Sequence, residues 1–330
     1  MKMRFLCTLL LGAMQCLAQP NVRIRGHFEG FPSSNYHISI KLSNSFYSSN
    51  SIAKGYTDNH GNFETDIRLE TPQKVSIDCL GYRVDFILSP NDTLVFCNPS
   101  RMQSPQVQGR TAALHQFLYE SMLLGRDSLR EKPLVQHMSL DNYSTIINDL
   151  ADQYWERFQR NCDTTNAFLT NYITASLEGQ KFLRKQTHVQ SQGETSRNES
   201  LRFKLLSDDA RVSDLYISSI YQQFSGASLD MGMTRGAFSV ADTTLWQKTY
   251  DTMLEALKSV PKTRELVLAQ LTHRSLFTRG NIAPNGRIKN FQGLFERFQR
   301  DFPNSSYLEA INEAIISTDI RFKPIEKPKN

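Results

Sequence analysis

The stretch TDNHGNF, residues 57–63, gathers an acid, two amides, a histidine and a glycine within one short run. Calcium loops use similar residues, but they place oxygen ligands at positions 1, 3 and 5, a glycine at position 6 and an acid at position 12. Counted from Asp58, position 3 is His60, the glycine arrives at position 4 and position 12 is Leu69. This spacing favours a hairpin turn, with Gly61 in the left-handed conformation, over a metal loop.

The remaining motifs for catalysis or cofactor binding are missing from the sequence. None of the seven histidines forms an H-E-x-x-H pair, and there is neither a G-x-S-x-G element nor a glycine-rich phosphate loop with its lysine. The adjacent acids Asp208 and Asp209 fall at an expected helix start, where the helix dipole favours negative charge. The motifs therefore give no catalytic residue, no metal ligand and no cofactor, and we expect the protein not to be an enzyme.

Three cysteines, Cys79, Cys97 and Cys162, lie outside the predicted signal peptide. Cys79 and Cys97 fall in neighbouring strand-like segments and could form a disulfide in an oxidising compartment. Burial of all three as small hydrophobic residues is an equal alternative. No C-x-x-C pair occurs in the sequence.

The N-terminus has the pattern of a secretory signal peptide, residues 1–18. Lys2 and Arg4 precede an apolar run, and Ala18 ends a small-residue cleavage signal. This pattern predicts export, to the periplasm or the cell surface. No later apolar run is long enough to span a membrane. Without the signal peptide the net charge falls from +5 to +3, which is too small to indicate nucleic acid as a partner.

From Val22 to about Asn98, apolar residues alternate with polar ones, which is the period of a half-buried strand. Turn residues such as Pro90, Asn91 and Asp92 separate the alternating runs. The pattern predicts an N-terminal domain, residues 20–106, built as a small antiparallel β-sandwich. Its six clearest strands cover residues 22–28, 37–42, 62–69, 74–80, 82–88 and 93–97.

After Gly109, apolar residues recur every three to four positions, which is the period of an amphipathic helix. We expect an α-helical domain over residues 107–322, arranged as a bundle, and a disordered tail over 323–330. Residues 185–200 carry few apolar side chains and are expected to form a loop. The predicted fold class is α+β. The expected helices cover residues 114–122, 143–158, 168–177, 215–224, 245–257, a run starting at Pro261, 288–302 and 305–316.

Four short motifs follow one another in a defined order. They are D-x-x-G-x-F at 58–63, P-x-D-T at 90–93, a glycine-led helix start at 109–117 and F-P-x-S-x-Y at 302–307. In this order they resemble the exported N-terminal region of TlpA/ResA-type thiol–disulfide oxidoreductases from Bacteroidetes bacteria. The resemblance implies a β-sandwich followed by helices, in the periplasm or on the outer surface. Asn91 stands where that family usually has a glycine.

The resemblance does not carry over the family's chemistry. Those oxidoreductases continue into a thioredoxin domain with C-x-x-C, and thiol exchange needs a low-pKa thiolate and a resolving thiol. We therefore expect a non-catalytic binding or scaffold protein of the bacterial cell envelope, with a separate thioredoxin-like protein as a candidate partner. The alternative is a glycan-binding or small-molecule-binding protein with a cleft between sandwich and helices.

Proteins of such bacteria can carry O-glycans at Asp-Ser/Thr sites followed by a hydrophobic residue or threonine. The resemblance thus makes Ser128, Thr164 and Thr243 candidate glycan acceptors. The alternative is that these residues belong to helix caps, where Asp, Ser and Thr are common.

Overall fold

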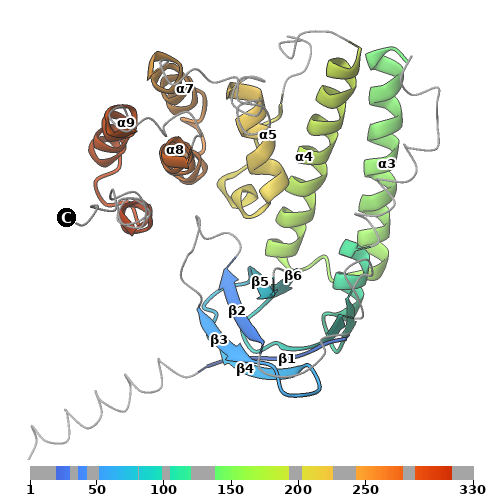
Figure 1. Ribbon diagram of the computed structural model, residues 1–330. Coiled ribbons are helices and arrows are strands. Elements are labelled where there is room, and N and C mark those ends of the chain that lie inside the picture. Colours follow the sequence, from blue (N-terminus) through green and yellow to red (C-terminus); the bar gives the residue numbers. More distant parts are fainter. Residues whose placement is uncertain are drawn as a thin grey trace, which may run out of the picture. The chain divides into compact units, whose positions relative to one another are not determined.

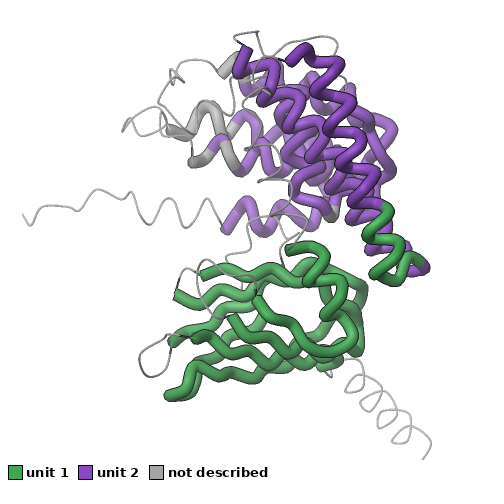
Figure 2. Tube along the Cα trace, turned by 90° about the vertical axis from the view of Figure 1, so that its right-hand side faces the viewer, with its two compact units in different colours: residues 1–131, 156–164 green, residues 132–155, 165–330 purple. Residues whose placement is uncertain are grey.

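The structure is a computed structural model, and it describes residues 20–29, 36–42, 52–80, 82–98, 105–119, 138–192, 203–225, 243–277 and 287–313. The predicted signal peptide, the predicted tail and Ser128 lie outside these residues. The chain divides into two compact units, residues 1–131 with 156–164 and residues 132–155 with 165–330 (Figure 2). The first unit holds the strands, and the second holds most of the helices.

The strands of the first unit form two four-stranded sheets (Figure 1). One sheet, called the β1 sheet below, has the order β4-β1-β7-β8. The other, the β2 sheet, has the order β3-β2-β5-β6. The strand bounds are β1 Val22–Phe28, β2 His37–Leu42, β3 Ala53–Tyr56, β4 Asn62–Ile67, β5 Gln73–Cys79, β6 Tyr82–Leu88, β7 Thr93–Asn98 and β8 Gln106–Gln108.

The inner faces of the two sheets share one apolar core. Ile24 and Phe28 of the β1 sheet and Ile38 and Ile40 of the β2 sheet are at most 1% exposed. Within each strand the two are an even number of positions apart and so point to the same face, because strand side chains alternate between faces. Burial of such a side chain contributes about 1.5–3 kcal/mol. The predicted N-terminal sandwich and the α+β class are confirmed.

The strand pairing differs from the prediction in two places. β1 and β7 are parallel, with His27 opposite Cys97, whereas the sequence indicated antiparallel sheets throughout. The expected hairpin across residues 57–63 is not formed, because β3 pairs with β2 and β4 pairs with β1. The turn instead takes the chain from one sheet to the other. Alternation within a strand shows which face is buried but not which strand lies beside it, so the sequence pattern could not distinguish these pairings.

The first unit continues past the predicted domain boundary at residue 106. β8 pairs with β7, and a helix at residues 112–119 follows. The His115 ring on this helix meets the Phe86 ring edge-on at 5.2 Å, and Tyr119 Oη donates a hydrogen bond of 3.0 Å to the Asp85 carbonyl oxygen. The helix therefore packs against β6 and belongs to the sandwich.

The second unit is helical, as predicted. Its elements also include a helical segment at residues 307–313. None of the helices among the described residues has the length and apolar character needed to cross a membrane. The helix bounds are α3 Leu140–Asn161, α4 Ala167–Ser191, the 3-10 turn η2 Asp208–Val212, α5 Asp214–Ser225, α7 Thr243–Ala256, α8 Pro261–Phe277 and α9 Arg287–Asp301. The end of α3, from Glu156 on, belongs to the first unit.

The polar run after Lys185 was expected to be a loop, and for its first part this prediction is wrong. α4 continues to Ser191 and buries Gln186, His188 and Val189. The His188 ring stacks on Tyr143 of α3 at 4.1 Å, and its Nε2 lies 3.0 Å from the Met138 carbonyl oxygen. Because Gln186 and His188 are polar, the buried face of this part of α4 lacks the apolar pattern by which a helix is recognised in a sequence.

The helices α4 and α5 approach each other closely at Gly179. A Cβ placed on Gly179 would lie 2.6 Å from the Leu215 backbone carbon and 2.8 Å from the Tyr216 backbone nitrogen. Ser219 of α5 donates a hydrogen bond of 2.9 Å to the Gly179 carbonyl oxygen. The glycine is therefore required by the backbone-to-backbone contact, not by a turn.

Helix caps follow the sequence only in part. Ser139 Oγ accepts a hydrogen bond from the Asn142 backbone N–H at 3.4 Å and caps α3. α4 is capped by Asn166, not by Asp163 or Thr164, because the Asn166 side chain accepts from the Leu169 backbone. Asp208 does act as a cap, but for α8, since its carboxylate accepts from the Thr263 backbone at 2.8 Å.

Candidate functional site

The outer face of the β1 sheet carries a row of paired polar side chains, called the outer ladder below. Antiparallel register puts Arg23, Arg25 and His27 of β1 directly opposite residues of β4. Opposite charges or hydrogen-bonding groups face each other at each step. The pairs are Arg23 with Asp66 at 3.0 Å, Arg25 with Glu64 at 3.1 Å and His27 with Asn62 at 2.9 Å.

The TDNHGNF turn fixes the end of the outer ladder. The Asp58 carboxylate accepts hydrogen bonds from the His60 and Asn62 backbone N–H groups, both at 2.8 Å, and from the Asn62 side chain at 3.1 Å. These bonds, the Asn62 side chain first, lower the pKa of Asp58. Gly61 has φ +80, and a Cβ there would lie 2.5 Å from the Phe28 carbonyl oxygen. The predicted turn and its left-handed glycine are confirmed, although the turn joins strands of two different sheets and closes no hairpin.

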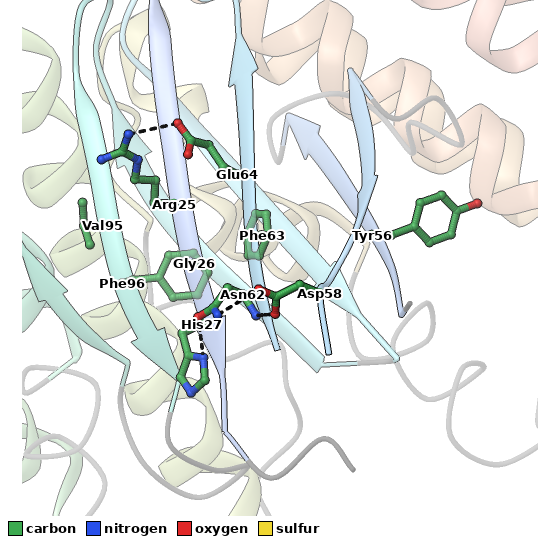
Figure 3. A pocket seen from close by; sticks show the side chains of 10 residues that line it. All are labelled: Arg25, Gly26, His27, Tyr56, Asp58, Asn62, Phe63, Glu64, Val95 and Phe96. Carbon is green, nitrogen blue, oxygen red and sulfur yellow. Dashed lines mark hydrogen bonds and ion pairs between the residues drawn. The ribbon is translucent and has the colours of Figure 1, made fainter. Parts of the chain in front are cut away.

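The turn also determines which nitrogen of His27 carries a proton. A carboxylate only accepts, so the Asn62 group facing Asp58 is the amide NH₂. The Asn62 Oδ1 then faces His27 Nδ1, and because an amide oxygen only accepts, Nδ1 is the donor. In the neutral ring this leaves Nε2 with a free lone pair. Asp58 and Asn62 together therefore prepare His27 Nε2 to bind a partner (Figure 3).

Two further side chains that can bind a metal ion, Cys97 and Glu29, lie next to His27. Cys97 of β7 is opposite His27 in the parallel register, and Glu29 follows two residues later on the same face. A ring nitrogen of His27, a carboxylate oxygen of Glu29 and Cys97 Sγ all lie within 4.8 Å of one another. These three residues, called the His27 cluster below, offer nitrogen, oxygen and sulfur ligands to a metal ion.

Within the His27 cluster the thiol donates a hydrogen bond to the carboxylate. Cys97 Sγ donates to Glu29 Oε1 at 3.6 Å. Partial burial, and then Glu29 through this hydrogen bond and its charge, raises the pKa of Cys97. At neutral pH the thiol is therefore protonated and a poor nucleophile, and a cation placed between sulfur and carboxylate would relieve the charge that opposes ionisation.

A hollow of about 560 Å³ lies beside the outer ladder. Its lining includes His27, Asn62, Glu64 and Tyr56, and the Tyr56 ring points away from the other three side chains (Figure 3). Tyr56 is 65% exposed, which is high for a large aromatic residue. The hollow thus combines fixed polar groups with one exposed ring, the composition of a site for a polar ligand.

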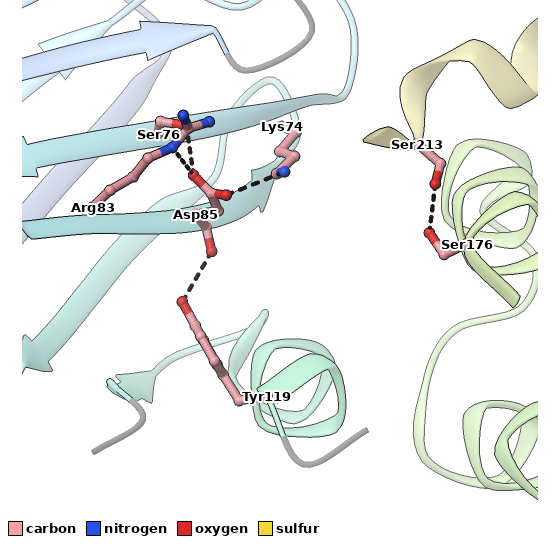
Figure 4. Close-up of polar contacts among 7 residues, drawn as sticks. All are labelled: Lys74, Ser76, Arg83, Asp85, Tyr119, Ser176 and Ser213. Atoms are coloured by element: carbon pink, nitrogen blue, oxygen red, sulfur yellow. Dashed lines mark hydrogen bonds and ion pairs between the residues drawn. The ribbon is translucent and has the colours of Figure 1, made fainter. Parts of the chain in front are cut away.

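A second polar group in the sandwich centres on Asp85 of β6 and is structural (Figure 4). Asp85 pairs with Lys74 at 3.1 Å and accepts from Ser76 at 2.5 Å and from Arg83 at 2.9 Å. Burial alone would raise the pKa of Asp85, but Lys74, Ser76 and Arg83 together hold it below its usual value. Each carboxylate oxygen has a partner, so no ligand is needed there.

The disulfide between Cys79 and Cys97, one of the two alternatives for these residues, is not formed in the structure, where both are free thiols. Cys79 points from β5 into the sandwich core and is 0% exposed, whereas Cys97 is on the outer face of the β1 sheet. One sheet therefore separates the two sulfurs. Neighbouring segments in the sequence suggested proximity, but the two strands belong to different sheets.

The candidate glycan acceptors fall in different places. Thr164 is exposed in the turn between α3 and α4. Thr243 is the first residue of α7. Ser128 lies outside the described residues.

Sequence reasoning missed His27 and Glu29 as functional candidates. The familiar metal-binding motifs place their ligands at helical or loop spacings, whereas His27 and Glu29 are two residues apart at the end of a strand. That pair was a usable signal, because residues i and i+2 of a strand share one face. Cys97 could not have been added, since nothing in the sequence showed that β7 lies beside β1.

Comparisons with protein-family models, with curated proteins and with solved structures found no match to this chain.

Proposed function

We propose that this protein is a non-catalytic binding or scaffold protein of the bacterial cell envelope, which acts through the outer face of the β1 sheet. The observation that carries the proposal is the outer ladder with its adjoining hollow. Its polar groups are fixed before any partner arrives, so little conformational entropy is lost on binding. The signal-peptide pattern and the resemblance described above support an envelope location, and a separate thioredoxin-like protein remains the candidate partner.

The thiols support a role other than thiol–disulfide exchange. Burial raises the pKa of Cys79 to about 11, and burial also raises the pKa of Cys162. The pKa of Cys97 is raised as well, by partial burial and by Glu29. A catalytic thiol in an exchange enzyme needs the opposite shift. An insulin-reduction assay should therefore show no turnover, and turnover that depends on any of the three cysteines would contradict the proposal.

The second candidate is binding of a glycan or another small polar molecule. The exposed Tyr56 ring in the lining of the hollow favours it, because sugars stack on exposed aromatic rings while hydrogen-bonding to fixed polar groups. This version places the ligand on the sandwich, not in a cleft between sandwich and helices.

Site-directed photocrosslinking in intact cells tests the proposal. A photoreactive amino acid replaces Tyr56, and in a matched control it replaces Leu80, which is 54% exposed. The proposal predicts a discrete crosslinked envelope protein from position 56 and none from position 80. Equal products from both positions, or none from either, contradict the binding face. A crosslink to glycan, detected by lectin staining, supports the second candidate. Recovery of the protein in the cytoplasm with residues 1–18 attached contradicts the location.

A further inference from the structure

We propose that the His27 cluster binds a divalent transition metal ion of the zinc class, through His27 Nε2, Cys97 Sγ and a Glu29 carboxylate oxygen. Asn62 and Asp58 orient His27 without touching the ion. This site goes beyond the proposed function and does not rest on it, because it depends only on strand register and side-chain chemistry.

The backbone holds the three ligands on one face. The parallel pairing of β1 and β7 puts His27 beside Cys97. The pairing continues past the end of β1, since the Glu29 backbone N–H donates to the Asn98 carbonyl oxygen at 3.1 Å. Glu29 is thereby fixed two residues beyond His27, on the same side of the sheet.

The spacing of the ligand atoms suits a small ion after a modest side-chain movement. In a tetrahedral zinc site, ligand atoms stand about 3.5 Å apart, given metal–ligand bonds of about 2.0–2.3 Å. The atoms of the His27 cluster lie within 4.8 Å of one another, and Glu29 is exposed. Rotation of the Glu29 and Cys97 side chains brings the three atoms onto one ion without moving the backbone.

The donor types select the metal. A thiolate and an imidazole favour zinc and its neighbours over calcium or magnesium, which prefer oxygen ligands alone. On binding, the Cys97 Sγ–H bond breaks, the proton leaves to solvent and a bond from sulfur to the ion forms. The ion also neutralises the carboxylate that faces the sulfur. Three protein ligands leave one coordination position for water or for a group from a partner.

The hydrogen-bonding partners of His27 are those of a metal ligand. Metal-binding histidines characteristically donate their second ring N–H to a carboxylate or carbonyl, which fixes the tautomer and the ring orientation. His27 Nδ1 does so to the Asn62 amide oxygen, and Asn62 is held in turn by Asp58. The TDNHGNF turn therefore orients the ligand His27 through Asn62 and Asp58, although the turn supplies no ligand itself.

Cobalt(II) titration of the tag-free protein tests the site. We expect one ion per chain, the intense visible absorption of tetrahedral cobalt, and a near-ultraviolet sulfur-to-cobalt charge-transfer band. Zinc should displace the cobalt and should raise Tm, because an ion that binds only the folded state stabilises it. Absence of the charge-transfer band, or of binding, overturns the proposal while leaving the crosslinking test of the binding face unaffected.

Variants separate ligands from supporting residues. Cys97→Ser should abolish the charge-transfer band, and His27→Ala should weaken zinc binding at least about 100-fold. Asn62→Ala should weaken zinc binding by about 10–100-fold while keeping the band. The matched controls Cys162→Ser and His37→Ala should bind as the parent does. Binding that depends on Cys162 or His37, or that is unchanged in Cys97→Ser, overturns the proposal. Circular dichroism of each variant verifies that it is folded.

Discussion

Asn62 and His27 face each other across β4 and β1, and the Asn62 amide oxygen lies 2.9 Å from His27 Nδ1. The Asn62 NH₂ group donates to the Asp58 carboxylate, which can only accept, so the Asn62 amide oxygen must be the atom that faces His27. The contact therefore predicts which ring nitrogen carries the proton in the neutral form of His27. In nitrogen-15 NMR spectra at pH 8, His27 should show Nδ1 protonated and Nε2 as the unprotonated nitrogen. Asn62→Ala should restore the Nε2-protonated form that free histidine prefers, and an Nε2-protonated parent would contradict the assignment.

The ion pair between Asp85 and Lys74 predicts an asymmetry in mutant stability. The Lys74 side chain is only 10% exposed, so Asp85→Ala leaves a nearly buried ammonium without its carboxylate. We expect a loss of about 2 kcal/mol in the free energy of unfolding. Lys74→Met combined with Asp85→Leu should recover most of it. Arg25→Ala on the half-exposed outer ladder is the control and should cost under about 1 kcal/mol. A loss in the double variant larger than in Asp85→Ala would contradict the argument.

His115 predicts a dependence of stability on pH. Its side chain is 0% exposed, and burial lowers its pKa to about 4, opposed only in part by the nearby Ile87 backbone. The unfolded chain, with a histidine pKa near 6.5, binds the proton more readily, so stability falls as pH drops from 6.5 to 4. The total effect is about 3 kcal/mol.

Urea unfolding at pH 7 and at pH 4.5 measures this effect. His115→Leu should remove a large part of the fall between the two pH values, even if its stability at pH 7 differs from that of the parent. His37→Gln, at an exposed position, should leave the fall unchanged. An identical fall in His115→Leu and in the parent would show that other groups cause it.

The close backbone contacts around Gly179 predict that alanine is not tolerated at this position. The added methyl would meet the Leu215 and Tyr216 backbones at under 3 Å, and backbone cannot rotate away. We expect Gly179→Ala to cost about 2–3 kcal/mol. Gly293→Ala is the matched control, since the nearest atom to its Cβ is a flexible Gln247 nitrogen at 3.8 Å, and it should be neutral or stabilising by about 0.5–1 kcal/mol. Both tryptophans, Trp155 and Trp246, belong to the second unit, so fluorescence follows its unfolding directly.

Periodicity was sufficient to predict the fold class and most of the elements, although the short strands β3 and β8 are not among the six clearest predicted strands. The strand at Val22–Phe28 was predicted to the residue, since VRIRGHF alternates without a break. The periodic helices were found for the same reason. The region after Lys185 was missed because its buried face includes the polar side chains of Gln186 and His188, which a hydrophobic pattern does not detect.

The candidate site was much harder to predict than the fold. The turn at Asp58 was correctly identified, but its role depends on Asn62 facing His27, which needs the pairing of β4 with β1. To predict that Cys97 lies beside His27, one must know that β1 and β7 form a parallel pair, although the two residues are 70 positions apart in the sequence. Long-range register arises from the packing of the whole sandwich, and no local pattern encodes it.

The zinc-edge X-ray absorption spectrum of the zinc-loaded, tag-free protein tests the metal site most directly, because it reports the ligand atoms themselves. The account predicts one sulfur scatterer at about 2.3 Å together with nitrogen and oxygen scatterers at about 2.0–2.1 Å, and loss of the sulfur in Cys97→Ser. A shell of nitrogen and oxygen alone in the parent protein would contradict it.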